Sequence, residues 1–119
     1  HKSDGLIVSS ATGSTAYMYS GGGPVLYPTL DVFAIMPMFS HSSSTRPLIL
    51  PADDELELKY EHNEKAKVIL DGHNEFDLDS GDSLKIKNSS TRYKLIHPSD
   101  YDYFDACRSK LYWGLPIVK

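Results

Sequence analysis

The sequence predicts a mainly β fold, a two-sheet β-sandwich with one short helix on its N-terminal side and one helix at the C-terminus. Two observations support this fold class. Several short segments alternate polar and apolar residues, which is typical of antiparallel strands with one solvated and one buried face. Helix start and stop signals occur together near residues 12–24 and near residues 99–114. Short strands separated by turn signals favour two sheets packed against each other.

The first segment combines a buried strand with a short helix. Residues 5–9 are apolar and end in a small hydroxyl residue, which suits a buried strand. A loop of small and hydroxyl residues follows, and Thr12 or Ser14 is expected to cap the helix that continues to Ser20. The helix must end at residues 21–24, because three glycines and a proline stand there in succession.

The remaining strands are expected in the middle of the chain, and a second helix near its end. Turn signals stand at Asp71-Gly72 and at Gly81-Asp82. Residues 101–111 have helical spacing, with Ser99 or Asp100 as the expected cap. The predicted strands are 31–38, 48–50, 55–60, 67–70, 83–87 and 92–95.

Length and composition indicate one ordinary globular domain. A chain of 119 residues can bury a single hydrophobic core, so we expect one domain spanning residues 1–119. With 40% hydrophobic and 24% charged residues, the chain is neither disordered nor a disulfide scaffold. It begins at His1 without an initiator Met and enters an apolar run within a few residues. This start predicts a fragment that enters in the middle of a fold.

Charge and hydropathy exclude several classes of partner. The formal net charge of -4 gives no reason to expect a nucleic-acid partner. No apolar run approaches the roughly 18 residues of a membrane helix, so no membrane partner is expected. The single cysteine, Cys107, cannot form an internal disulfide, which favours a reducing compartment and hence a cytoplasmic location. No metal site is predicted, because the histidines lack metal-ligand spacing (His1, His41, His62, His73 and His97).

Residues 4–24 carry the strongest functional signal. Small residues in the loop let a ligand approach the backbone, and the first N–H groups of the helix are unpaired. Tyr17 and Tyr19 offer aromatic faces for a base, and Asp4 offers an acceptor for ribose hydroxyls. From composition alone, a purely structural strand-to-helix connection explains the segment about equally well.

The order of the residues resembles the signature of the NAD kinase family. The match is close over residues 4–51 and looser at residues 71–72, 81–83 and 111–114. It rests first on the string Asp4-Gly5, Thr12-Gly13-Ser14-Thr15-Ala16-Tyr17, Ser20 and Gly22-Gly23-Pro24, and then on residues 28–31, 36–39, 41–42 and 46–51.

The resemblance implies a role for each matching residue. Asp4 would contact a ribose of NAD, and Ser20 would lie near the nicotinamide amide. Thr15, Ala16 and Tyr17 would line the pocket for the adenine and nicotinamide rings, partly across a subunit boundary. The implied substrate-binding set is Asp4, Thr12, Ser14, Thr15, Ala16, Tyr17, Ser20, Asp71, Gly72 and His73.

The chain also departs from the family pattern. Ser10-Ala11 replaces the usual Thr-Pro, and Met18-Tyr19 replaces a small or aliphatic pair. The Gly-Gly-Asp-Gly motif, whose Asp is the family's general base, belongs to an N-terminal α/β lobe and is absent from these 119 residues. We therefore expect no catalytic residue in this chain, and we expect it to be inactive alone.

The activity that the resemblance implies is ATP-dependent phosphorylation of the adenosine-ribose 2′-hydroxyl of NAD, which gives NADP. Mg²⁺ or another divalent metal would accompany ATP, and a homodimer or homotetramer is expected. Two alternatives remain open. One is a non-catalytic dinucleotide-binding module. The other is the substrate lobe of a related lipid kinase, for which we would expect a more apolar pocket and no Thr-Gly-Ser-Thr-Ala-Tyr string.

Overall fold

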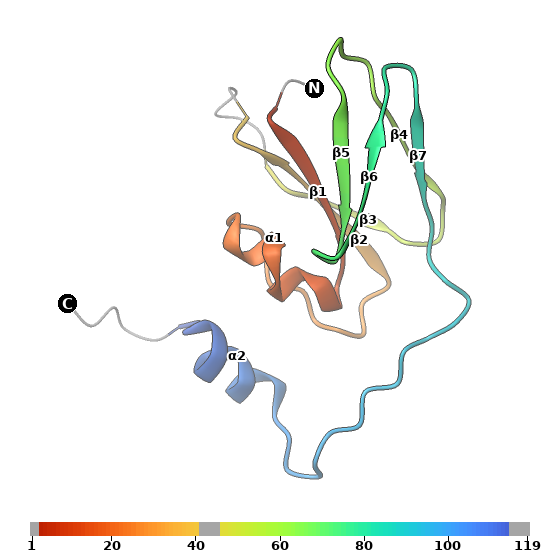
Figure 1. The fold of residues 1–119 in the computed structure, drawn as a ribbon. Coiled ribbons are helices and arrows are strands. Elements are labelled where there is room, and N and C mark those ends of the chain that lie inside the picture. The colour runs from red at the N-terminus through yellow and green to blue at the C-terminus, as the bar shows by residue number, and fades with distance from the viewer. Residues whose placement is uncertain (1–2, 41–45, 115–119) are drawn as a thin grey trace, which may run out of the picture.

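The computed structural model describes residues 3–40 and 46–114, which are mainly β (Figure 1). The mainly β class with a helix near each end is confirmed, and hydrogen bonding divides the strands of this described part into three antiparallel sheets. The elements in chain order are β1 (Gly5–Ser10), the 3-10 helix η1 (Thr12–Thr15), α1 (Tyr17–Ser20), β2 (Val32–Met38), β3 (Leu48–Pro51), β4 (Leu56–Lys59), β5 (Ala66–Leu70), β6 (Asn74–Leu78), β7 (Ser83–Ile86) and α2 (Tyr103–Leu111).

The largest sheet has the order β1-β2-β3, and Ile7 of β1 pairs with Met36 of the central strand β2. Within the described residues, the pairing of β2 with β3 stops at Ile35, so the last part of β2, Met36 through Met38, pairs there with β1 alone. Pro37 lies in that part, where its missing N–H breaks no bond to β3. β2 runs through Pro37 and ends at Met38, as the predicted strand 31–38 does.

The core lies between α1 and this sheet. Met18 of α1 is 1% exposed and packs with the buried residues Ala34 and Met36 of β2. Ile7 and Leu26 are partly buried against the same cluster. Because Met36 also pairs with Ile7, burial of Met18 fixes the helix over the β1–β2 part of the sheet.

The end of α1 is set by two glycines for different reasons. Gly22 has φ +89°, a left-handed conformation that favours glycine. Gly23 is close to the helix, and a Cβ atom there would lie 2.8 Å from the carbonyl oxygen of Met18. The predicted end of the helix at residues 21–24 is confirmed, since α1 ends at Ser20.

The other strands form two two-stranded sheets, β4 with β7 and β5 with β6. β6 was not predicted, although its residues 75–78 alternate polar and apolar side chains. Conversely, residues 92–95 form no strand, so that prediction was wrong. Tyr93 and Ile96 are 98% and 97% exposed in the long connection that leads to α2 (Figure 1).

The C-terminal helix α2 is confirmed, but its cap differs from the prediction. Asp102, rather than Ser99 or Asp100, accepts a hydrogen bond from the backbone N–H of Asp105. Cys107 is buried within the helix as a free thiol. In residues 3–40 and 46–114, no helix has the length and apolar character that crossing a membrane requires.

Candidate functional site

The loop between β1 and α1 folds without the predicted side-chain cap. Neither Thr12 nor Ser14 is the N-cap of a helix. The N-cap residues of η1 and α1 are Ala11 and Ala16, and no side chain makes a capping hydrogen bond at either. The buried hydroxyl of Ser14 donates to the carbonyl of Ala11 at 2.6 Å and accepts from the N–H of Leu26 at 2.9 Å. Ser14 thus ties the loop to the segment after α1, and its contact with a substrate stays a prediction.

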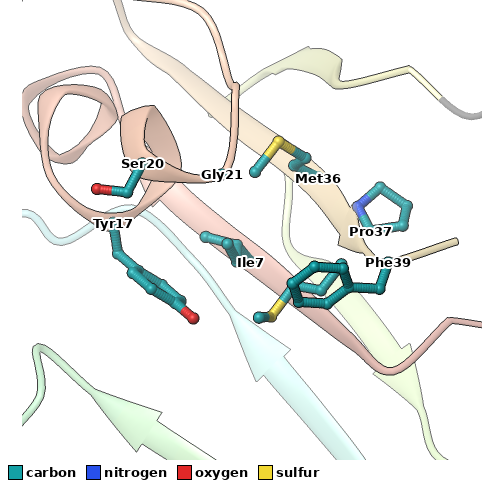
Figure 2. Close-up of a pocket in the computed structure, with 8 residues that line it drawn as sticks. Ile7, Tyr17, Ser20, Gly21, Met36, Pro37 and Phe39 are labelled. Carbon is teal, nitrogen blue, oxygen red and sulfur yellow. The ribbon is translucent and has the colours of Figure 1, made fainter.

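A pocket of about 260 Å³ lies between α1 and the β1–β2 edge of the sheet (Figure 2). Tyr17 and Ser20 of α1 line one side, and Met36 through Phe39 line the other. Figure 2 shows Ile7 of β1 between these two walls. The second wall is the end of β2 beyond Ile35, the last β2 residue with a described partner in β3.

The chemistry of the pocket suits one uncharged ring system. Its described lining residues are apolar apart from the hydroxyls of Tyr17 and Ser20, and they include no charged side chain. Its volume lies below the roughly 300–1,000 Å³ typical of pockets for drug-sized ligands. The pocket therefore fits a single heterocycle with a polar substituent better than a whole dinucleotide, and its described lining offers no cation to pair with phosphates.

Asp4 lies beside the pocket rather than in its lining. The backbone N–H of Asp4 donates to the carbonyl of Met38 at 3.0 Å, and Met38 lines the pocket. The Asp4 side chain is exposed. A carboxylate at this end of β1 is accessible to a ligand that extends out of the pocket past Met38.

Three predicted loop residues are outside the pocket lining. Thr12 and Ala16 are exposed, and the hydroxyl of Thr15 donates to the carbonyl of Thr12 at 3.4 Å. Of the string from Thr12 to Tyr17, only Tyr17 reaches the pocket wall.

The predicted turn at residues 71–73 belongs to a different sheet. It joins β5 to β6, and the N–H of His73 donates to the carbonyl of Leu70 at 3.1 Å. Asp71 and Gly72 have positive φ values of 49° and 74°, as a type I′ hairpin turn requires. The pocket lining does not include this turn, so its contact with a substrate stays a prediction.

Sequence reasoning did not assign the sheet-side wall of the pocket to the site. Met36, Pro37, Met38 and Phe39 were matched to the family string but were given no role in binding. Phe39 is 77% exposed and has φ 47°, a strained conformation for a bulky residue. The available signal was the proline in a strand-like run, which marks an open sheet edge. His41, which belongs to the same family string, lies outside the described residues.

Two tyrosines connect α2 to the pocket region. The hydroxyl of Tyr19 donates to the carbonyl of Leu111 at 3.0 Å, and that of Tyr103 donates to the carbonyl of Leu26 at 3.2 Å. Burial, followed by a hydrogen bond with Cys107, raises the pKa of Tyr103 to about 12. The Tyr103 hydroxyl therefore stays protonated, as a donor, at neutral pH.

The described residues hold no metal centre. In residues 3–40 and 46–114, no three His, Cys, Asp or Glu side chains are grouped so that they could bind a metal ion.

Comparison with known proteins identifies the family. Residues 1–98 match the family model of the ATP-NAD kinase C-terminal domain. The chain is 45% identical over 120 residues to an NAD kinase of Cellvibrio japonicus, covering 99% of this chain and 40% of that protein. It is 47% identical over 115 residues to an NAD kinase of Pseudoalteromonas translucida, covering 95% of this chain and 39% of that protein.

Solved structures agree. The fold is similar to yeast NADH kinase complexed with NADH, with a TM-score of 0.80 and 26% identity over 98% of this chain and 38% of that one. It is also similar to an Archaeoglobus fulgidus NAD kinase in complex with ATP, with a TM-score of 0.66 and 32% identity over 74% and 33% of the two chains. The chain thus spans about 40% of the length of the curated relatives it matches. On this evidence the chain belongs to the NAD kinase family and corresponds to its C-terminal domain.

Proposed function

We propose that this domain binds NAD and that the protein containing it phosphorylates NAD to NADP with ATP. The observation that carries the proposal is the pocket between Tyr17 and Ser20 of α1 and the end of β2. It fits one heterocyclic ring with a polar substituent, which describes adenine and also the nicotinamide ring, although the latter carries a positive charge in NAD. Asp4 stands next to Met38 at its side, where a carboxylate can accept hydrogen bonds from ribose hydroxyls.

The reaction is transfer of a phosphoryl group to an alcohol. The adenosine-ribose 2′-oxygen of NAD forms a bond to the γ-phosphorus of ATP, the bond to the β–γ bridging oxygen breaks, and ADP leaves. The 2′-hydroxyl gives its proton to a general base. Catalysis of this kind rests mostly on positioning and on charge stabilisation. The domain would supply positioning, through the two walls of its pocket.

The base and the metal are assigned to another part of the protein. We infer that an N-terminal α/β lobe with a Gly-Gly-Asp-Gly motif supplies the base, and that residues 1–119 form one C-terminal lobe. Mg²⁺ would bind with the phosphates of ATP.

We further propose a homodimer or homotetramer in the cytoplasm. The buried free thiol of Cys107 supports a reducing compartment. Exposed apolar side chains support assembly, among them Ile69 and Leu70 of β5 and Phe76 of β6, which are 60%, 49% and 41% exposed.

Calorimetric titration of the full-length protein with NAD tests the proposal. Asp4→Ala and Tyr17→Ala should each weaken binding, because they remove the ribose acceptor and one wall of the pocket. Asp54→Ala and Tyr93→Ala are matched controls, since both residues are exposed and neither lines the pocket. NADP formation from NAD and ATP should be measured in parallel.

The outcomes separate the alternatives. Binding that is lost in the two pocket variants and retained in the controls, together with NADP formation, supports the kinase. Binding without NADP formation, in a full-length protein without the Gly-Gly-Asp-Gly motif, would identify a non-catalytic dinucleotide-binding module. A full-length protein that binds no NAD would overturn the proposal.

A further inference from the structure

The helix α2 is hydrogen-bonded at both of its ends to the segment that builds the pocket. At its C-terminal end, the carbonyl of Leu111 accepts from the hydroxyl of Tyr19, 92 residues away in sequence. At its N-terminal end, the hydroxyl of Tyr103 donates to the carbonyl of Leu26, 77 residues away. Both bonds are partly buried, so water competes for them less than at the open surface.

The first of these bonds reaches the pocket wall directly. Tyr19 lies in α1 between Tyr17 and Ser20, both of which line the pocket, whereas Tyr19 itself does not. A four-residue helix is far too short to be stable by itself, because helix nucleation is costly. Its orientation therefore depends on outside contacts, namely Met18 in the core and Tyr19 on α2.

The second bond reaches the binding loop through a chain of hydrogen bonds. The carbonyl of Leu26 accepts from Tyr103, while the N–H of Leu26 donates to the hydroxyl of Ser14. Ser14 in turn donates to the carbonyl of Ala11, at the start of η1. Tyr27, the next residue, packs edge-on against Tyr103 at a ring distance of 5.1 Å. Tyr103 of α2 thus contacts this segment twice, through its hydrogen bond to Leu26 and through its ring contact with Tyr27.

The acceptor on α2 explains why the Tyr19 bond forms. Leu111 is the last residue of the helix, and the last carbonyls of a helix have no partner within it. A tyrosine hydroxyl from α1 satisfies this carbonyl and also links the two helices. A phenylalanine at position 19 would keep the ring but lose the link.

We propose that α2 is a brace for the dinucleotide pocket, and that Tyr19 and Tyr103 are positioning residues that set affinity for the dinucleotide without touching it. The part of this inference that concerns affinity rests on the proposed function. The brace itself rests on the two hydrogen bonds. When either hydrogen bond is lost, α1 is in the binding arrangement for a smaller fraction of the time. The apparent affinity for the dinucleotide falls in proportion to that fraction.

Tyr19→Phe and Tyr103→Phe in the full-length protein test the brace. Each should raise the KM and the Kd for NAD roughly two- to tenfold, the range for loss of one hydrogen bond, with a smaller effect on kcat. Amide hydrogen exchange without ligand should be faster in α1, at the N–H groups of Ser20 and Gly21 that bond to Ala16 and Tyr17.

Tyr60→Phe is the matched control. It removes a tyrosine hydroxyl that donates to the backbone carbonyl of Glu64 at 2.6 Å, in a turn outside the pocket lining. It should leave the KM for NAD and the exchange in α1 unchanged. Equal exchange in α1 for wild type, Tyr19→Phe and Tyr103→Phe would overturn the brace. If the wild type binds no NAD, the proposed function fails, and the exchange data still decide whether the brace exists.

Discussion

The carboxylate of Asp31 accepts two parallel hydrogen bonds from the guanidinium of Arg92, each 2.8 Å long. Asn88 donates a third bond to the same carboxylate at 3.0 Å. These contacts tie the long connection before α2 to the residue that precedes β2. The paired geometry is the strongest form of an arginine–carboxylate contact, although both side chains are exposed to water and salt.

The first prediction concerns the pH dependence of this anchor. The hydrogen bond from Arg92, followed by that from Asn88, lowers the pKa of Asp31 below its ordinary value of 3.8. A lowered pKa means that the folded state prefers the ionised form. Its stabilisation is present above pH 3.8 and is lost as pH falls through the lower folded value. Urea denaturation should show Asp31→Asn less stable than wild type at neutral pH, with the difference shrinking in acid and in high salt. A difference that persists unchanged well below pH 3.8 would contradict it, and Asp54→Asn serves as the control.

The second prediction concerns the glycines after α1. In Gly23→Ala the new methyl group would meet the backbone carbonyl of Met18 at 2.8 Å, which cannot move without displacing the helix. In Gly21→Ala the methyl group would meet the terminal methyl of the Met36 side chain, which is flexible. Thermal denaturation should therefore show a loss of about 1–3 kcal/mol for Gly23→Ala, the usual cost of overpacking, and a smaller loss for Gly21→Ala. Equal losses of stability in the two variants would contradict this prediction, because they would show that the backbone of α1 moves aside as easily as the Met36 side chain.

The fold was predicted from sequence where local chemistry decided it. The run of glycines at 21–23 ends α1 as expected, because φ and close contact there exclude most other residues. β6 was missed although residues 75–78 alternate polar and apolar side chains, and its pairing with β5 is set by the turn at Asp71-Gly72. Residues 92–95 were wrongly predicted as a strand, because alternation alone does not supply a partner strand, and Arg92 is instead fixed by Asp31.

The candidate site was predicted only in part for a similar reason. Tyr17 and Ser20 were identified because they belong to a local string, and they do line the pocket. The opposite wall depends on where the described part of β3 stops pairing with β2, a tertiary property of which Pro37 is the one local signal. The links from Tyr19 and Tyr103 to distant backbone carbonyls are invisible in sequence for the same reason.

The third prediction separates the effect on NAD binding from the effect on stability for Met36 and Phe39, the two ends of the sheet-side wall of the pocket. Met36 is buried in the core as well as lining the pocket, so Met36→Ala should cost about 2–5 kcal/mol of stability. Phe39 lines the pocket but is largely exposed, so Phe39→Ala should leave the melting temperature nearly unchanged and weaken NAD binding. Melting curves and calorimetric titration of the full-length protein measure the two effects. Phe39→Ala with unchanged NAD affinity would remove that wall from the proposed site.

The fourth prediction concerns Tyr103 at high pH. Its pKa of about 12 in the folded protein exceeds the ordinary value of 10.0, mainly because burial disfavours the charged form. For a raised pKa, the associated stability is fully present below pH 10 and is lost as pH rises toward 12. The phenolate absorbance of wild type should therefore show one tyrosine that ionises late, and Tyr103→Phe should lack that step. Unfolding in denaturant should also become easier between pH 10 and 12 in wild type, and less so in Tyr103→Phe. If wild type shows no late step that Tyr103→Phe lacks, burial does not raise the pKa of Tyr103 in solution.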